Sequence, residues 1–166
     1  MMEREEEGTA ARIRALRLAV IQPELDRLVK TTGDGFLAEF ASPVEAVRSA
    51  LAIQDQLAKS INQAIRLRIG INLGDIIVED DSDVIGDGVN AAARLEQIAE
   101  PGGVCLSGSV HEQVAGKIDR SFENRGEQHV KNVSRPIRVY ALAGTVTVQR
   151  ERAVLPLPDK LCVPKT

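Results

Sequence analysis

A glycine-flanked aspartate between two short apolar segments constrains the fold of this chain more than any other feature. The Gly-Asp-Gly sequence at 33–35 separates the segments 28–32 and 36–40, and its glycines supply the backbone angles that a tight hairpin tip requires. The pattern predicts a β-hairpin that holds Asp34 at its tip, towards a metal ion, with Lys30 nearby on the same ribbon. Most such tripeptides are ordinary turns, so the motif needs support from elsewhere in the chain.

Beyond this hairpin, helical and strand patterns alternate along the chain. Ser42, Pro43 and Glu45 form a strong helix start, because serine caps the helix, proline suits its first position and glutamate completes a capping box. Strict alternation over 66–73 predicts a strand with one buried face. We also expect helices over 3–25, 42–59, 88–99 and 109–115, and strands over 75–79, 104–107 and 137–142. This order predicts an α+β fold with helices packed on a largely antiparallel sheet.

Length and composition indicate one globular domain. The chain has 166 residues, of which 43% are hydrophobic and 27% are charged, and this is enough to bury a real core. We expect the domain to cover 1–143. The remaining segment, 144–166, contains prolines and no periodicity, which predicts a linker or a disordered tail.

Several classes of protein are disfavoured by the same data. A formal net charge of −3 and the scarcity of aromatic residues argue against a general nucleic-acid binder. The acidic N-terminus does not resemble a signal peptide, and no apolar run approaches the length of a membrane span. Cys105 and Cys162 match no zinc-binding or redox spacing. A reducing cytoplasm is therefore the expected location.

A second constellation lies in the segment 83–95. Asn90 and Arg94 are four residues apart on an expected helix and therefore share one face. An amide and a guanidinium suit a ribose and an anionic transition state, although a solvent-facing polar stripe has the same pattern. A dinucleotide-binding fingerprint over 86–91 is disfavoured because its glycines follow an acidic loop rather than a buried strand. A calcium loop from Asp81 is disfavoured because apolar residues occupy ligand positions.

Three motifs, taken in order, resemble the catalytic domain of class III nucleotidyl cyclases, in the bacterial adenylyl cyclase branch. They are Lys30-Thr31-Thr32-Gly33-Asp34-Gly35, Arg68-Ile69-Gly70-Ile71-Asn72-Leu73-Gly74-Asp75 and Gly86-Asp87-Gly88-Val89-Asn90-Ala91-Ala92-Ala93-Arg94-Leu95. The resemblance runs from residue 5 to residue 142. It implies the ferredoxin-like fold of these cyclases, with helices packed on a mainly antiparallel sheet.

The resemblance also implies a reaction. Members of this family convert a nucleoside triphosphate into a cyclic nucleotide and pyrophosphate, by in-line attack of the ribose 3′-oxygen assisted by two divalent cations, Mg²⁺ or Mn²⁺. By this resemblance Asp34 is one of two metal-bridging aspartates. Lys30 and Asp83 match the pair that reads adenine, so ATP is the expected substrate. Guanine would present a carbonyl to Asp83 and leave two acceptors facing each other.

The remaining roles follow from the same resemblance. Asn90 would orient the ribose, Arg94 would stabilise charge that develops on the phosphate, and Lys131 matches a lysine that binds the terminal phosphates. Taken singly, Lys30 and Lys131 also fit solvated surface lysines. In the family these groups come from two chains, so the resemblance implies a head-to-tail homodimer, or a heterodimer with an intact cyclase domain.

The resemblance further implies an N-terminal truncation. The first strand of the family carries the second metal aspartate, and no apolar segment of this kind precedes the expected helix 3–25. The leading hypothesis is an adenylate cyclase that makes cyclic AMP in signal transduction. The alternative is a catalytically impaired homologue, a dimerisation or regulatory module that completes the site of an intact partner. A third possibility is a product without a stable fold.

Overall fold

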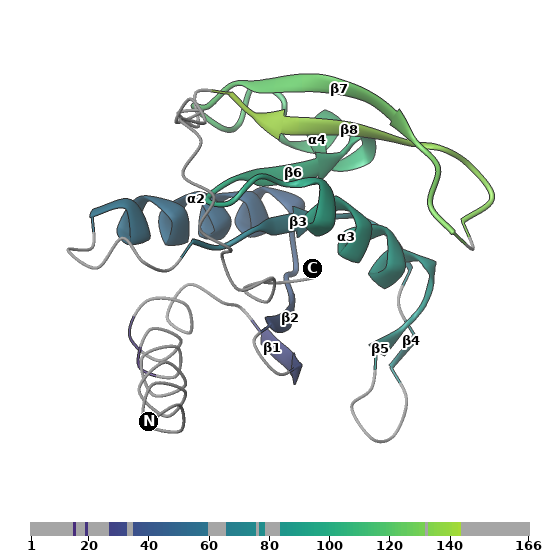
Figure 1. Cartoon of the computed structure of the whole chain (residues 1–166), viewed down its shortest axis with the longest axis horizontal. Helices are drawn as coiled ribbons and strands as arrows, with labels where there is room; N and C mark the ends of the chain where they lie inside the picture. The colour runs from purple at the N-terminus through teal and green to yellow at the C-terminus, as the bar shows by residue number, and fades with distance from the viewer. Residues whose placement is uncertain are drawn as a thin grey trace, which may run out of the picture.

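A four-stranded mixed sheet is the main sheet of the structure (Figure 1). Its strands follow the order β3 (Ile69–Ile71), β6 (Val104–Ser107), β8 (Ile137–Leu142) and β7 (Phe122–Gln128). β3 and β6 are parallel, and the other two pairs are antiparallel. The structure is a computed structural model that describes residues 15, 19, 27–32, 35–59, 66–75, 77–78, 84–131 and 133–143.

Two hairpins and three helices complete the described part of the chain. β1 (Arg27–Thr32) pairs with β2 (Gly35–Glu39), and β4 (Ile77–Val78) pairs with β5 (Val84–Ile85). The helices are α2 (Pro43–Lys59), α3 (Asp87–Ile98) and α4 (Gly108–Val114). Figure 1 shows the β4–β5 hairpin extending away from the main sheet beyond the first turn of α3. The α+β class predicted from the sequence is confirmed.

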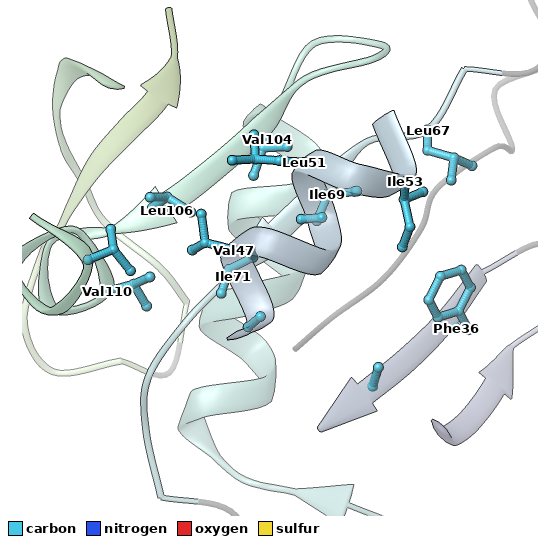
Figure 2. Close-up of a cluster of buried hydrophobic side chains, with 14 of the residues drawn as sticks. Phe36, Val47, Leu51, Ile53, Leu67, Ile69, Ile71, Val104, Leu106 and Val110 are labelled. Atoms are coloured by element: carbon cyan, nitrogen blue, oxygen red, sulfur yellow. The ribbon is translucent and has the colours of Figure 1, made fainter. Parts of the chain in front are cut away.

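The two faces of the main sheet carry different helices. Neighbouring residues of a strand point to opposite faces, and in β6 Val104 and Leu106 pack in the cluster that contains α2 and α4. Cys105, between them, packs with Leu95 of α3 and Val139 of β8. The sheet is therefore covered by α2 and α4 on one side and by α3 on the other. Figure 2 shows side chains of the larger cluster, including Val47, Leu51, Ile53, Ile69, Ile71, Val104, Leu106 and Val110.

Helix α2 begins where the sequence predicts. The backbone N–H of Val44 donates to Ser42 Oγ at 3.2 Å, so the serine caps the helix as expected. Near the C-terminal end of α2, Gln54 is only 8% exposed, and its buried side-chain amide forms two hydrogen bonds. Its Nε2 donates to the carbonyl oxygens of Leu67 at 3.0 Å and Gly103 at 3.1 Å. These bonds attach α2 to the starts of β3 and β6.

The strand predicted over 66–73 is shorter and more deeply buried than expected. Regular pairing is limited to 69–71, and all three residues of β3 are buried. The prediction of one buried face was wrong because α2 packs on one side of this strand and α3 on the other. Of the strand predicted over 75–79, the described residues show β4 at Ile77–Val78, and residues 76 and 79 lie outside the described part.

Two strands were not predicted. β7 has an exposed interior and contains Gly126 at φ 85°, where its register with β8 shifts, so it carries no apolar alternation. β5 has only two residues and pairs only with β4 among the described strands. The expected helix over 3–25 and the expected tail over 144–166 lie outside the described residues, apart from residues 15 and 19. Within the described residues, no helix has the length and apolarity needed to cross a bilayer.

Candidate active site

The structure brings the second and third sequence motifs into direct contact, because α3 lies against β3. Gly70 is the closest point. A Cβ atom added there would clash with the backbone nitrogen of Glu96 and the backbone oxygen of Ala92, and would lie 2.9 Å from the Leu95 carbonyl carbon. Only glycine allows the helix backbone to approach the strand this closely. This contact sets the distance between α3 and the sheet.

A second contact fixes the start of α3. Asn72 Nδ2 donates to the carbonyl oxygen of Gly88 at 3.1 Å. Beside this bond two glycines meet, since a Cβ on Gly74 would lie 3.1 Å from Gly88 Cα. The helix cap, Gly86, adopts φ 148°, a conformation that side chains rarely allow, and no side chain caps the first turn. The backbone N–H groups of Val89 and Asn90 instead donate to the Gly86 carbonyl, at 3.1 and 3.3 Å.

Asn90 and Arg94 stand on the exposed side of α3. Both residues are exposed, and their spacing of four places them on one face of the helix, as predicted. Arg94 Nη1 donates to Gln97 Oε1 at 3.3 Å. Among the described residues the Arg94 guanidinium forms no ion pair with a carboxylate. The guanidinium therefore retains donors that an anionic ligand can use.

The other predicted site residues are placed less completely. Lys30 lies in β1, opposite Leu37 of β2, and only its backbone is described. Asp34 lies outside the described residues, between Thr32 and Gly35, which pair with each other at the end of the hairpin. Asp83 also lies outside them, directly before β5 in the sequence. Lys131 is exposed in the connection between β7 and β8. The predicted hairpin is confirmed, whereas the geometry of these four side chains stays a prediction.

A cavity of about 240 Å³ lies between the β1–β2 hairpin and the end of β3. Among the described residues, β2 forms no strand pairing with β3. Leu73, at the rim, is 48% exposed although it is a large apolar residue. The lining consists of residues 37–43, Ala46, 71–74, Gly88, Val89 and Val110. The cavity thus touches the first turn of α3 on the side of Gly88 and Val89.

Cys105, which packs with Leu95 of α3 in the core, does not offer a reactive thiol. Burial raises the pKa of the Cys105 thiol from 9.0 to about 11, with a lowering contribution from Arg125 and a raising one from Glu100. A protonated, buried thiol is a poor nucleophile.

Within the described part of the chain, no three His, Cys, Asp or Glu side chains group as a metal site, and Asp34 falls outside that part. A carboxylate such as Asp34 is nevertheless the donor type that Mg²⁺ and Mn²⁺ prefer.

The sequence reasoning missed two residues near this site. Asn72 was expected only as part of a strand, and its bond to Gly88 depends on a contact between segments that no local pattern reveals. Glu96 is 4% exposed on α3, and its Oε1 has no hydrogen-bond partner among the described residues. Glu96 follows Leu95 and lies one helical turn after Ala92, so the spacing of the buried residues places it on the buried face of α3.

Comparisons with known proteins agree with the sequence resemblance. A family model described as the adenylate and guanylate cyclase catalytic domain matches residues 16–144. A protein of Rhizobium meliloti (strain 1021) called "Putative adenylate cyclase 3" is 45% identical over 149 residues, which cover 84% of this chain. The chain spans 25% of the length of that relative.

Solved structures give the same result for the fold. A crystal structure of an adenylate/guanylate cyclase/hydrolase from Silicibacter pomeroyi matches with a TM-score of 0.76 and 41% identity, covering 85% of this chain and 87% of the other. An adenylate cyclase of Trypanosoma brucei, in its monomeric state, matches with a TM-score of 0.67 and 22% identity, covering 80% and 77%, which supports the fold alone. The chain therefore belongs to the family of class III adenylate and guanylate cyclase catalytic domains.

Proposed function

We propose that this chain is an adenylate cyclase domain that converts ATP into cyclic AMP and pyrophosphate in a cytoplasmic signalling pathway. The observation that carries the proposal is the pair formed by Asn90 and Arg94 on the exposed side of α3. Its helix is anchored to the sheet at Gly70 and Gly88, so the pair is presented by a rigid element. The 45% identity to the Rhizobium meliloti protein supports ATP as the substrate.

The chemistry of the pair suits phosphoryl transfer with a ribose hydroxyl as nucleophile. The Asn90 amide can donate to a ribose oxygen and orient the sugar, so that its 3′-oxygen lies in line with the α-phosphorus. Arg94 carries a permanent positive charge with planar donors that match phosphate oxygens. Negative charge develops on the phosphate during the attack, and a fixed guanidinium stabilises it without reorganisation.

The other predicted residues complete the proposal. Lys30 and Asp83 would read adenine, the lysine by donating to a ring nitrogen and the carboxylate by accepting from the exocyclic amine. Lys131 would bind the terminal phosphates. Cyclases of this family use divalent metal ions, which neutralise phosphate charge and activate the attacking hydroxyl when bound. Asp34 would supply one of their carboxylate ligands.

Cyclases of this family also act as dimers. We propose that two chains associate head to tail, with the α3 pair of one protomer facing the metal-binding hairpin of its partner. The exposure of Asn90 and Arg94 in a single chain is in keeping with this arrangement, because groups that complete a partner's site must be accessible before assembly. An intact cyclase domain could take the place of the second copy.

The test is an assay of the purified chain with ATP and Mn²⁺, in which cyclic AMP and cyclic GMP are separated by mass. We expect cyclic AMP, and we expect Arg94→Ala to lower kcat by about a hundredfold or more, as when one transition-state donor is removed. Arg125→Ala is the matched control, because Arg125 is an exposed arginine of β7 that pairs only with Glu123 among the described carboxylates.

Three other outcomes would change the conclusion. Full activity of Arg94→Ala would refute the role of the pair. Cyclic GMP as the main product would refute the base assignment. Activity that appears only after mixing with an intact cyclase domain, and that Arg94→Ala abolishes, would support the alternative of a module that completes a partner's site.

A further inference from the structure

The hydrogen bond from Asn72 to Gly88 joins two segments that the proposed reaction has to keep in register. Residues 72–75 lead from β3 into the β4–β5 hairpin, and residues 86–88 lead from that hairpin into α3. Figure 1 shows the hairpin extending outward from this junction. The segments that enter and leave the β4–β5 hairpin therefore meet where Asn72 Nδ2 donates to the Gly88 carbonyl oxygen at 3.1 Å.

The contacts around this bond leave little room for adjustment. A Cβ on Gly88 would lie 3.3 Å from the Asp75 carbonyl oxygen and 3.4 Å from Gly74 Cα, so backbone packs directly on backbone. Such contacts hold the segments close, but they include no directional bond between the first turn of α3 and the end of β3. The Asn72 amide is the side chain that supplies a directional bond here among the described residues.

The consequence concerns Asn90, which lies two residues after the bonded carbonyl. Glycine occupies the cap position of α3, and among the described residues no side chain caps its first turn. A shift of this turn would move Asn90 relative to β3 and to β5, which Asp83 directly precedes in the sequence. A displacement of about 1 Å in a reactive geometry costs about a hundredfold in rate.

We propose that Asn72 is a positioning residue of this cyclase domain, which holds the first turn of α3 against the end of β3 and so sets Asn90 relative to β3 and to the β4–β5 hairpin, whose sequence contains Asp83. The importance of this position rests on the proposed function, whereas the hold on α3 rests on the hydrogen bond itself. Asn72 touches the backbone of α3 and is not assigned any contact with the substrate.

The test uses substitutions that change the donor and keep the shape. Asn72→Asp has the same size but replaces the N–H donor with a carboxylate oxygen, which would face the Gly88 carbonyl oxygen. Asn72→His restores an N–H donor at the same distance from the backbone. Asn124→Asp is the matched control, because Asn124 uses its Oδ1 to accept from the Gly126 N–H at 2.8 Å, and an aspartate keeps that bond.

Two readouts separate positioning from a general loss of structure. In hydrogen–deuterium exchange, we expect the amides of residues 88–92 to exchange about tenfold faster in Asn72→Asp, a change equivalent to about 1.4 kcal/mol. Amides of the distant strand β7 should be unchanged. In the cyclase assay, we expect kcat to fall by about tenfold or more and the preference for ATP over GTP to weaken, with recovery in Asn72→His.

Equal exchange over 88–92 in Asn72→Asp and Asn124→Asp would overturn the proposal. So would a loss of activity in Asn72→Asp with unchanged preference for ATP and no recovery in Asn72→His. A wild-type chain that makes no cyclic nucleotide would count against the proposed function instead. The exchange experiment would then still decide whether Asn72 holds α3.

Discussion

Replacing Gly70 with alanine tests the contact that places α3 on the sheet. The three described atoms nearest to the added methyl group would all be backbone atoms of α3, at Ala92, Leu95 and Glu96. A clash with a flexible side chain can be relieved by a change of rotamer, but a clash with a helix backbone cannot. The helix must therefore retreat from β3, or β3 must bend towards α2.

The size of this movement gives the expected cost. The Leu95 carbonyl carbon would lie 2.9 Å from the new Cβ, where ordinary contacts begin at 3.4 Å, so it must retreat by about 0.5 Å, and the other two atoms must move further. Leu95 is 1% exposed and Ala92 is 0% exposed, so their packing is loosened by any retreat. Overpacking costs about 1–3 kcal/mol, and we expect about 3 kcal/mol because the strain falls on the backbone.

For a domain of this size, that cost lowers the melting temperature by roughly 6–12 °C. Thermal unfolding followed by far-ultraviolet circular dichroism measures it directly. Gly116→Ala is the control, because Gly116 adopts φ +74° and no atom of the described part of the chain would lie within 4 Å of an added Cβ. That variant reports the cost of the left-handed conformation alone, about 1–2 kcal/mol. A Gly70→Ala protein that melts within about 2 °C of the wild type, or above Gly116→Ala, would refute the close-contact account.

Two further predictions concern buried polar groups. Gln54→Leu removes two hydrogen bonds to backbone carbonyls and should lower the free energy of unfolding, measured by urea titration, by about 1–3 kcal/mol. Gln113→Leu, at an exposed position of α4, is the control and should leave the free energy of unfolding unchanged. Equal stability of the two variants would contradict this prediction. Because burial raises the pKa of Cys105 to about 11, the unfolded chain ionises first, so this residue's contribution to stability is complete below pH 9 and is lost as the pH rises towards 11. Iodoacetamide should accordingly alkylate Cys105 of the native protein at pH 8 far more slowly than in denaturant, as mass spectrometry would show, and equal rates would contradict its burial.

Local patterns predicted those elements whose determinants lie within a few residues. The Ser42-Pro43 start of α2 and the Gly-Asp-Gly hairpin depend on caps and turns that are visible in the sequence, and both strand pairing and capping agree with them. The same holds for Asn90 and Arg94, because a spacing of four on a helix determines their common face. These features could be predicted because each is decided by local geometry.

Other features depend on contacts between distant segments and could not be predicted locally. β7 is an edge strand with an exposed, charged interior, and its pairing with β8 decides its conformation. The alternation over 66–73 predicted one buried face because polar Arg68 and Asn72 follow the same side as Gly70. In the structure α3 covers that side at Gly70, and the alternation within the strand does not reveal this contact with a distant helix.

The role of the glycines connects the fold to the proposed chemistry. Gly70, Gly74 and Gly88 bear no reactive group, yet they lie where α3 meets the strand and its extension, and each leaves no room for a side chain at ordinary distance. The segment 68–75 therefore acts as the surface on which α3 is seated, and the segment 86–95 carries the polar pair. The glycines of this cyclase motif are explained if their function is to let α3 pack closely against the strand. It follows that substitutions at Gly74 or Gly88 should affect the α3 pair before they affect the rest of the domain.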